Sequence, residues 1–353
     1  MDFTFTEEQR ELRRTVRSFL TSHSPGTETW SQLVNQLGLT GLAVPERFGG
    51  AGASFVEVAV VLDEMGRCLY PDPYLPTVTA AAALAAATEP DLAGELLAAI
   101  AAKGAVATLA VAEERARWDP GNLTTTARET AGGLVIDGVK DFVLDGDDAE
   151  IILVAAGLGG DAALLAVAGD APGLTRRRHP TLDQTRAQAR LTFDSVPARL
   201  VSSGPQATAH AISVVQVALA VESAGAAARC LDLTVDYLKT RVQFGRALGT
   251  FQALRHRCAD LAVAVEAATA TAYYAAWAAA QAPDELPVVA PLAKAYCSEA
   301  FLRVAAETIQ LHGGIGFTWE HDAHRYFKRA TTTALLFGSA RELRRAAAAQ
   351  AGI

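Results

Sequence analysis

The sequence predicts an α+β protein with three domains, in the order helical, β and helical. Apolar residues recur at helical spacing from about residue 6 to 105 and again from about residue 205 onward. Between about residues 106 and 198, short apolar runs are broken by Gly, Asp and Pro, which is typical of an antiparallel sheet. We therefore expect domains at residues 1–105, 106–198 and 199–353.

The first domain is expected to begin with an amphipathic helix. Thr6 and Gln9 have the spacing of a capping box, in which each side chain binds the backbone N–H of the other residue. The apolar residues that follow fall on one helical face: Leu12, Val16, Phe19 and Leu20. Glycine and proline predict a loop at residues 38–52, and a helix is expected from Val56 to Gly66, ending in Gly66–Arg67.

The middle domain is expected to be a small barrel or a sandwich of two sheets. Its candidate strands are Val106–Val111, Leu134–Ile136, Ile151–Ala155, Ala163–Val167 and Ala189–Phe193. Asp137 and Gly138 predict a tight hairpin, because a type I′ turn needs positive φ at both central positions.

The last domain follows Pro205 and is rich in alanine. The helical pattern of residues continues through Ala280. A proline-containing break at residues 282–287 separates it from the helices that run to the C-terminus. Small side chains suit closely packed helices, so we interpret the alanine as packing material.

Composition narrows the class of protein. With 353 residues, 50% of them apolar, the chain can bury a sizeable core. The net charge of -8 argues against nucleic acid as a partner, because phosphate-binding surfaces are normally basic. No apolar run of membrane length and no signal peptide are visible, so a cytoplasmic protein is expected. The widely spaced cysteines are interpreted as buried thiols: Cys68, Cys230, Cys258 and Cys297.

Two segments have side chains suited to a dinucleotide, Arg241–Gln252 and Gln310–Thr318. The guanidinium of Arg241 offers several charge-assisted donors to a pyrophosphate, and glutamine amides can bond sugar or adenine edges. Gly313 and Gly314 allow a backbone to lie close to a ligand. Each segment alone is equally compatible with a turn or a helix end. The occurrence of both in one chain favours the ligand-binding interpretation.

The two segments resemble the flavin-binding signature of the acyl-CoA dehydrogenase family, and the resemblance covers the whole chain. Further segments that carry it are Leu42–Glu46, Gly49–Gly52, Leu182–Arg186, Phe193–Pro197 and Phe317–Arg329. The resemblance implies an N-terminal helical domain, a middle β domain and a C-terminal four-helix bundle, assembled into dimers or tetramers that share FAD sites. It implies contacts to FAD held mainly by a neighbouring subunit from Arg241, Gln243, Phe244 and Gln252, with Gln310, Gly313 and Gly314 on the adenosine side.

The family reaction removes a proton from the acyl α-carbon and a hydride from the β-carbon. It therefore needs a carboxylate base, usually a glutamate before a Gly-Thr near the C-terminus. Here Phe337 stands at that position, and the alternative position in some relatives, residues 213–217, has no acid. Glu222 is the nearest acid and is either a structural ion pair or a weak candidate base with a raised pKa. The catalytic base is thus not identified.

The flavin-ring segments depart from the family pattern. Residues 112–118 differ from the usual segment, and the family's Lys-x-Trp-Ile-Thr is Lys140–Leu144 here. Phe142 preserves the aromatic platform, whereas Leu144 lacks the hydroxyl that binds the ring. His321 and His324 have helical spacing but no third ligand, so no metal site is predicted, and His312 is interpreted as packing.

Three functions remain open. The chain is a dehydrogenase subunit that needs a related second chain to supply the base, a self-sufficient homo-oligomeric dehydrogenase with an unrecognised base, or a flavin-family scaffold or oxygen-using enzyme. The resemblance implies an acyl-CoA substrate and an electron-transferring flavoprotein as oxidant. Neither a nucleic-acid partner nor a membrane span is expected.

Overall fold

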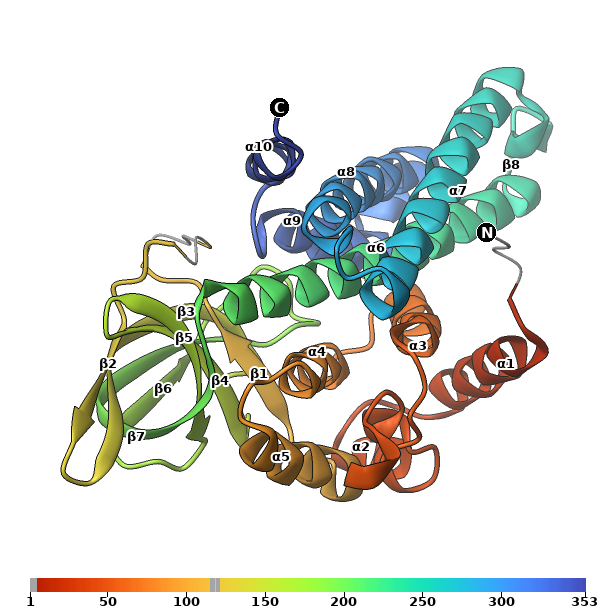
Figure 1. Ribbon diagram of the computed structural model, residues 1–353. Coiled ribbons are helices and arrows are strands. Elements are labelled where there is room, and N and C mark those ends of the chain that lie inside the picture. The colour runs from red at the N-terminus through yellow and green to blue at the C-terminus, as the bar shows by residue number, and fades with distance from the viewer. Residues whose placement is uncertain (1–4, 115–117, 119–120) are drawn as a thin grey trace.

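The computed structural model describes residues 5–114, 118 and 121–353, and it has three parts (Figure 1). The N-terminal part contains the helices α1 Glu7–Ser22, α2 Thr27–Asn35, α3 Phe55–Cys68, α4 Tyr74–Ala85 and α5 Pro90–Lys103. The expected loop at residues 38–52 contains two short 3₁₀ helices, η1 Leu39–Gly41 and η2 Glu46–Phe48.

The start of the first helix is as predicted. Gln9 donates its backbone N–H to Thr6 Oγ1 at 3.2 Å, and Thr6 donates its own to Gln9 Oε1 at 3.0 Å. Val16 and Phe19 are buried against the N-terminal core. The next helix was expected to end at Gly66–Arg67, and α3 ends one residue later, at Cys68. Gly66 is a position of close helix contact instead of a helix end.

The middle part is a closed barrel, one of the two expected architectures. Its strands are β1 Ala107–Ala110, β2 Thr126–Thr130, β3 Gly133–Leu144, β4 Ile151–Leu158, β5 Asp161–Ala168, β6 Leu174–Arg178 and β7 Gln188–Ser203. Among the described residues, the pairing β4-β2-β3-β7-β5 returns to β4 and closes the barrel, with β1 on β4 and β6 on β7 at the sides. Apolar side chains of these strands fill the interior.

The predicted hairpin at Asp137–Gly138 was wrong. The β2–β3 turn lies at residues 131–132, and Asp137 and Gly138 lie within β3, where the register shifts between Ile136 and Gly138. Gly138 has φ 144, and a Cβ there would lie 2.8 Å from Thr125. The glycine is therefore needed for a β-bulge instead of a turn.

Two strands were not predicted, and one runs past the expected boundary. β2 and β6 expose most of their side chains, so they lack the apolar runs that the prediction relied on. β7 continues to Ser203, past the expected domain end at residue 198, because its last residues pair with β5.

The C-terminal part is a helical bundle. Its elements are α6 Pro205–Thr240, β8 Val242–Gln243, β9 Arg246–Ala247, η3 Leu248–Thr250, α7 Gln252–Gln281, α8 Leu286–His312, η4 Gly313–Phe317, α9 Ala323–Leu335 and α10 Ala340–Gln350. The expected break at residues 282–287 lies between α7 and α8. Figure 1 shows α6 running from the barrel, above α4 and α3, to the β8–β9 hairpin at the far end.

The helix α6 is the central element of the molecule. Within the described part of the chain it is the one helix long and apolar enough to cross a membrane, and 89% of its most apolar window is buried inside the protein. It packs against α3, α4, α7 and α8, so it is a core helix that connects all three parts.

Candidate functional site

The turn after α9 contains Phe337, the residue that stands where the sequence resemblance implies a glutamate base. Phe337 has φ 53 and Gly338 has φ 106. Gln216 of α6 donates its amide to the Phe337 carbonyl at 3.2 Å, and Lys294 of α8 donates to the Gly338 carbonyl at 2.6 Å. Burial lowers the pKa of Lys294 to about 7. Two helices therefore hold this turn in one conformation.

The phenyl ring of Phe337 stacks on Trp118, with ring centroids 4.4 Å apart, and only 3% of Phe337 is exposed. Two clefts adjoin this aromatic pair, and Trp118 lines both. The barrel cleft, of about 390 Å³, is lined by residues that include Trp118, Phe142, His179, Gln188, Leu335 and Leu336. The bundle cleft, also of about 390 Å³, is lined by residues that include Trp118, Ser213, Gln216, Pro291, Phe337 and Glu342.

Glu342 is the one carboxylate among the described residues that line the bundle cleft. It caps the start of α10, where it accepts hydrogen bonds from the backbone N–H of Ser339 at 2.8 Å and from its hydroxyl at 2.6 Å. These bonds to Ser339 lower the pKa of Glu342. A carboxylate that is stabilised in its charged form is a weaker base, so Glu342 is poorly suited to remove an α-proton.

Glu222 is a buried structural acid. Its carboxylate binds the guanidinium of Arg186, and Arg329 donates to it at 2.8 Å. Arg329 also pairs with Asp183 at 2.9 Å. Burial by itself would raise the pKa of Glu222, but the charges of Arg186 and Arg329 lower it. The raised pKa considered for Glu222 was therefore wrong, and the side chain joins α6 to α9 and to the barrel as an ion pair.

Phe142 reaches the barrel cleft because of a second irregularity in β3. The register to β7 shifts between Lys140 and Val143, and Phe142 has φ 51. Its ring stacks against His179, with centroids 5.3 Å apart. Leu144 is instead buried in the core that the barrel shares with the helices, and it does not line the cleft. The aromatic platform is present, and Leu144 brings no hydroxyl to the cleft.

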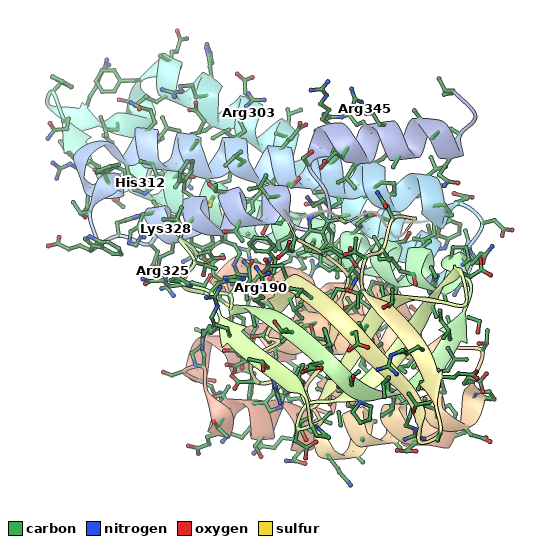
Figure 2. All side chains as sticks on the ribbon, turned by 90° about the vertical axis from the view of Figure 1, so that its left-hand side faces the viewer. Arg190, Arg303, His312, Arg325, Lys328 and Arg345 are labelled. Carbon is green, nitrogen blue, oxygen red and sulfur yellow. The ribbon has the colours of Figure 1, made fainter. Side chains whose placement is uncertain are left out.

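An outer groove of about 530 Å³ shares Leu182 with the barrel cleft. Its lining residues include Leu182, Ile309, Phe317, Trp319, His324 and Lys328. Lys328 lies over the Trp319 ring, 4.2 Å from the centroid. Figure 2 shows Arg190 of the barrel and Arg325 and Lys328 of α9 where the two parts meet. The cleft and the groove together provide an apolar channel with basic side chains near it, which fits a flat cofactor with anionic groups.

The residues predicted to reach FAD held by a neighbouring subunit form a separate group. Arg241, Gln243, Phe244 and Gln252 are exposed at the β8–β9 end of the bundle, with 88% of Phe244 accessible. Among the described residues, no side chain binds the guanidinium of Arg241. From Gln216, beside the clefts, to Thr240, α6 rises about 36 Å at 1.5 Å per residue. Arg241, at the end of α6, therefore lies far from the part of that helix that lines the bundle cleft.

Gln310 lies near the end of α8, directly after Ile309 of the outer groove, and Gly313 and Gly314 follow the helix; all three are exposed. Gly313 ends the helix with φ 63 and ψ −140, a conformation almost restricted to glycine. A Cβ at Gly314 would meet no atom within 4 Å. The helix-stop interpretation is thus correct for Gly313, and the open space at Gly314 is compatible with a ligand.

The histidines near this end have structural contacts. His312 is buried and stacks on Tyr237, with centroids 4.5 Å apart, and on His321 at 4.2 Å. His321 accepts the backbone N–H of Ala323 at 3.1 Å. No group of three metal-binding side chains occurs in the part of the chain that the structure describes.

Sequence reasoning missed several residues of the clefts. Trp118 belongs to the divergent segment 112–118, of which residues 115–117 lie outside the described residues. His179, Gln188 and Lys294 belong to no motif, and their roles depend on which strands and helices pack together. The one available signal was the polarity of Lys294 within an apolar helix.

A barrel between two helical domains, with an aromatic-walled cleft where barrel and bundle meet, defines the three-domain class of flavin-dependent dehydrogenases. The chain belongs to the acyl-CoA dehydrogenase family. Its N-terminal domain model matches residues 6–104, its middle domain model residues 108–196 and its C-terminal domain model residues 203–352. Members of this family are FAD-dependent oxidoreductases, and this chain is an acyl-CoA dehydrogenase-type oxidoreductase.

Individual relatives match nearly the full length. Acyl-CoA dehydrogenase IpdE2 of Mycobacterium tuberculosis is 38% identical, with 96% of each chain covered. A structure described as a Tcur3481-Tcur3483 steroid ACAD variant is 33% identical, with a TM-score of 0.90 and 98% of each chain covered. The ChsE4-ChsE5 complex of Mycobacterium tuberculosis contains a chain that is 28% identical, with a TM-score of 0.90 and coverage of 100% and 99%.

Proposed function

We propose that this chain is a subunit of a cytoplasmic FAD-dependent acyl-CoA dehydrogenase that desaturates an acyl-CoA thioester with the help of a related second subunit. One observation carries the proposal. Phe337 occupies the position of the base, and Gln216 and Lys294 hold its turn in place. Glu342, the carboxylate of the adjoining cleft, has a lowered pKa. A related subunit with a free carboxylate supplies the base that this chain lacks.

The distribution of the cofactor residues supports a shared FAD site. Bound FAD supplies the acceptor for the hydride that leaves the substrate. Arg241, Gln243, Phe244 and Gln252 are exposed far from the chain's own clefts, so they serve a cofactor held mainly by a neighbouring subunit. Gln310, Gly313 and Gly314 extend the same role to the adenosine side. Phe142 supplies the platform in the chain's own barrel cleft.

The relatives support a heteromeric assembly and suggest a substrate to test. One similar structure is the ChsE4-ChsE5 complex. Another is described as a Tcur3481-Tcur3483 steroid ACAD variant. We therefore propose a steroid-derived acyl-CoA thioester as the first substrate for assay. An electron-transferring flavoprotein is the proposed oxidant of the reduced cofactor.

The experiment is to express the chain alone and together with a related acyl-CoA dehydrogenase subunit from the same source. Bound FAD per chain and acyl-CoA-dependent dye reduction are then measured for each preparation. We expect little or no turnover from the chain alone and enoyl-CoA formation from the pair. Robust turnover by the pure homo-oligomer would contradict the proposal.

The second candidate function is a self-sufficient dehydrogenase. The observation that favours it is that the carboxylate of Glu342 lines the bundle cleft together with Phe337. If the isolated chain is active, Glu342→Gln should abolish the turnover and leave the flavin spectrum unchanged. If only the pair is active, the same substitution should leave turnover nearly unchanged.

A further inference from the structure

We infer that His179 and Gln188 form the polar edge of the barrel cleft and hydrogen-bond the flavin ring there, in place of the hydroxyl that Leu144 lacks. The inference rests on the proposed function, because it assigns this chain's own contacts to the flavin. It concerns two residues that lie outside every sequence motif described above.

Gln188 contributes a polar side chain to the lining of the barrel cleft. It begins β7, lines the barrel cleft and is only 3% exposed. Within the described residues, its side-chain amide makes no hydrogen bond. Because Gln188 lines the cleft, a ligand bound there can supply a partner for the amide.

His179 is held in a defined orientation. Its Nε2 lies 2.5 Å from Asp141 Oδ1, and the same carboxylate oxygen accepts the backbone N–H of Phe142 at 3.1 Å. Arg190 pairs with the second oxygen at 3.5 Å. An imidazole that donates Nε2–H to a carboxylate has an acceptor at Nδ1. In the part of the chain that the structure describes, Nδ1 has no hydrogen-bond partner.

The two polar groups lie at one edge of the cleft. The backbone N–H of His179 donates to the Gln188 carbonyl at 2.8 Å, so the residues are adjacent across the β6–β7 pair. Phe142 stacks on His179, and Leu335 and Leu336 of the α9 end contribute apolar lining. The cleft therefore combines apolar walls with a few polar side chains, which also include Thr181, Thr331 and Thr332, the usual form of a small-molecule site.

This edge matches the imide side of an isoalloxazine ring. An imide presents one N–H donor between two carbonyl acceptors. The side-chain N–H of Gln188 can donate to one of these carbonyls, and Nδ1 of a neutral His179 can accept the imide N–H. Asp141 acts as a positioning residue, since its carboxylate binds Nε2 of His179 and it does not line the cleft.

Riboflavin is the probe that tests these contacts, because it contains the ring without phosphate or adenosine. The FAD-free assembly with its partner is titrated with riboflavin, and binding is followed by quenching of flavin fluorescence. His179→Ala and Gln188→Leu are each expected to weaken riboflavin binding about threefold to tenfold, the value of one hydrogen bond. ADP binding, which reports the adenosine side, should not change in either variant.

His210→Ala is the matched control. His210 is a partly buried histidine of α6 that lines neither cleft. This variant should bind riboflavin like the unsubstituted protein, and circular dichroism with thermal unfolding verifies the fold of all three variants. Unchanged riboflavin binding in both His179→Ala and Gln188→Leu would overturn the inference while leaving the proposed function intact. Absence of FAD from every assembly would instead overturn the proposed function.

Discussion

The backbone of Gly66 in α3 lies directly against the backbone of Glu222 in α6. A Cβ at Gly66 would lie 2.2 Å from the Glu222 carbonyl oxygen, and a Cβ at Gly225 would lie 2.1 Å from the Asp63 carbonyl oxygen. The two helices therefore contact through a reciprocal pair of glycines. This contact brings the N-terminal part against the same stretch of α6 that carries the buried ion pairs.

Gly66→Ala is expected to lower the free energy of unfolding by about 1–3 kcal/mol, because the added methyl group forces α3 away from α6. Urea denaturation followed by circular dichroism measures the change. Gly157→Ala is the control, since a Cβ there meets its nearest atom at 3.9 Å, an ordinary contact. If Gly66→Ala and Gly157→Ala had the same free energy of unfolding, moving α3 away from α6 would cost no stability.

Glu222→Gln is expected to lower the free energy of unfolding by about 3–5 kcal/mol, because it leaves the buried guanidiniums of Arg186 and Arg329 without their shared counter-charge. Glu299→Gln, which breaks an exposed pair with Arg344, should cost less than about 1 kcal/mol. Denaturant titrations of both variants make the comparison. A stable Glu222→Gln protein would contradict the structural role assigned to this acid.

The carboxyl group of Asp145 is expected to make the free energy of unfolding depend on pH. Burial raises its pKa to about 7, although the charge of Arg186 opposes the shift. An unfolded aspartate titrates near pH 4, so the folded state binds the proton more tightly. The stabilisation is complete below about pH 4 and is lost as the pH rises through about 7.

Asp145→Asn removes this titration and suits the local backbone, because asparagine tolerates the φ of 48 at this position. Its thermal midpoint should exceed that of the unsubstituted protein at pH 8, and the advantage should shrink at pH 5.5. Scanning calorimetry at the two pH values measures both midpoints. A pH-independent difference would assign the effect to packing.

Arg241→Ala is expected to weaken FAD retention by about 1.5–3 kcal/mol through the loss of a charge-assisted hydrogen bond. The fold should be unaffected, because Arg241 is exposed and binds no described side chain. Arg303→Ala provides the control, as an exposed arginine of α8 that belongs to neither predicted cofactor segment (Figure 2). FAD per chain after gel filtration, with the extracted cofactor compared to FAD and FMN standards, decides the outcome.

Cofactor binding is expected to be linked to association. If Arg241 and Gln252 contact a flavin held by a neighbour, a monomer has only half of each site. Added FAD should then raise the thermal midpoint of the assembly, since a ligand bound only by the native oligomer stabilises it by mass action. Light scattering is expected to show a dimer or tetramer. A stable monomer with full FAD occupancy would limit these residues to a role within one chain.

Local sequence patterns determined the order of the three parts and many of their elements. The capping box at Thr6 and the break at residues 282–287 act over a few residues, so they are visible without the fold. The absence of an acid at Phe337 is equally a property of the sequence. The dinucleotide segments were also visible, because Arg241 and Gln310 belong to contiguous motifs.

Tertiary structure alone decided which groups meet. β2 and β6 are strands because of their neighbours, and Asp137–Gly138 forms a bulge because β3 continues past it to pair with β7. Glu222 became an ion-paired acid only when α9 and the barrel brought arginines to it. His179 and Gln188 became neighbours through strand pairing. Hydrogen bonds and charges act through space, so their partners depend on the packed fold, whereas caps and turns depend on the adjacent residues.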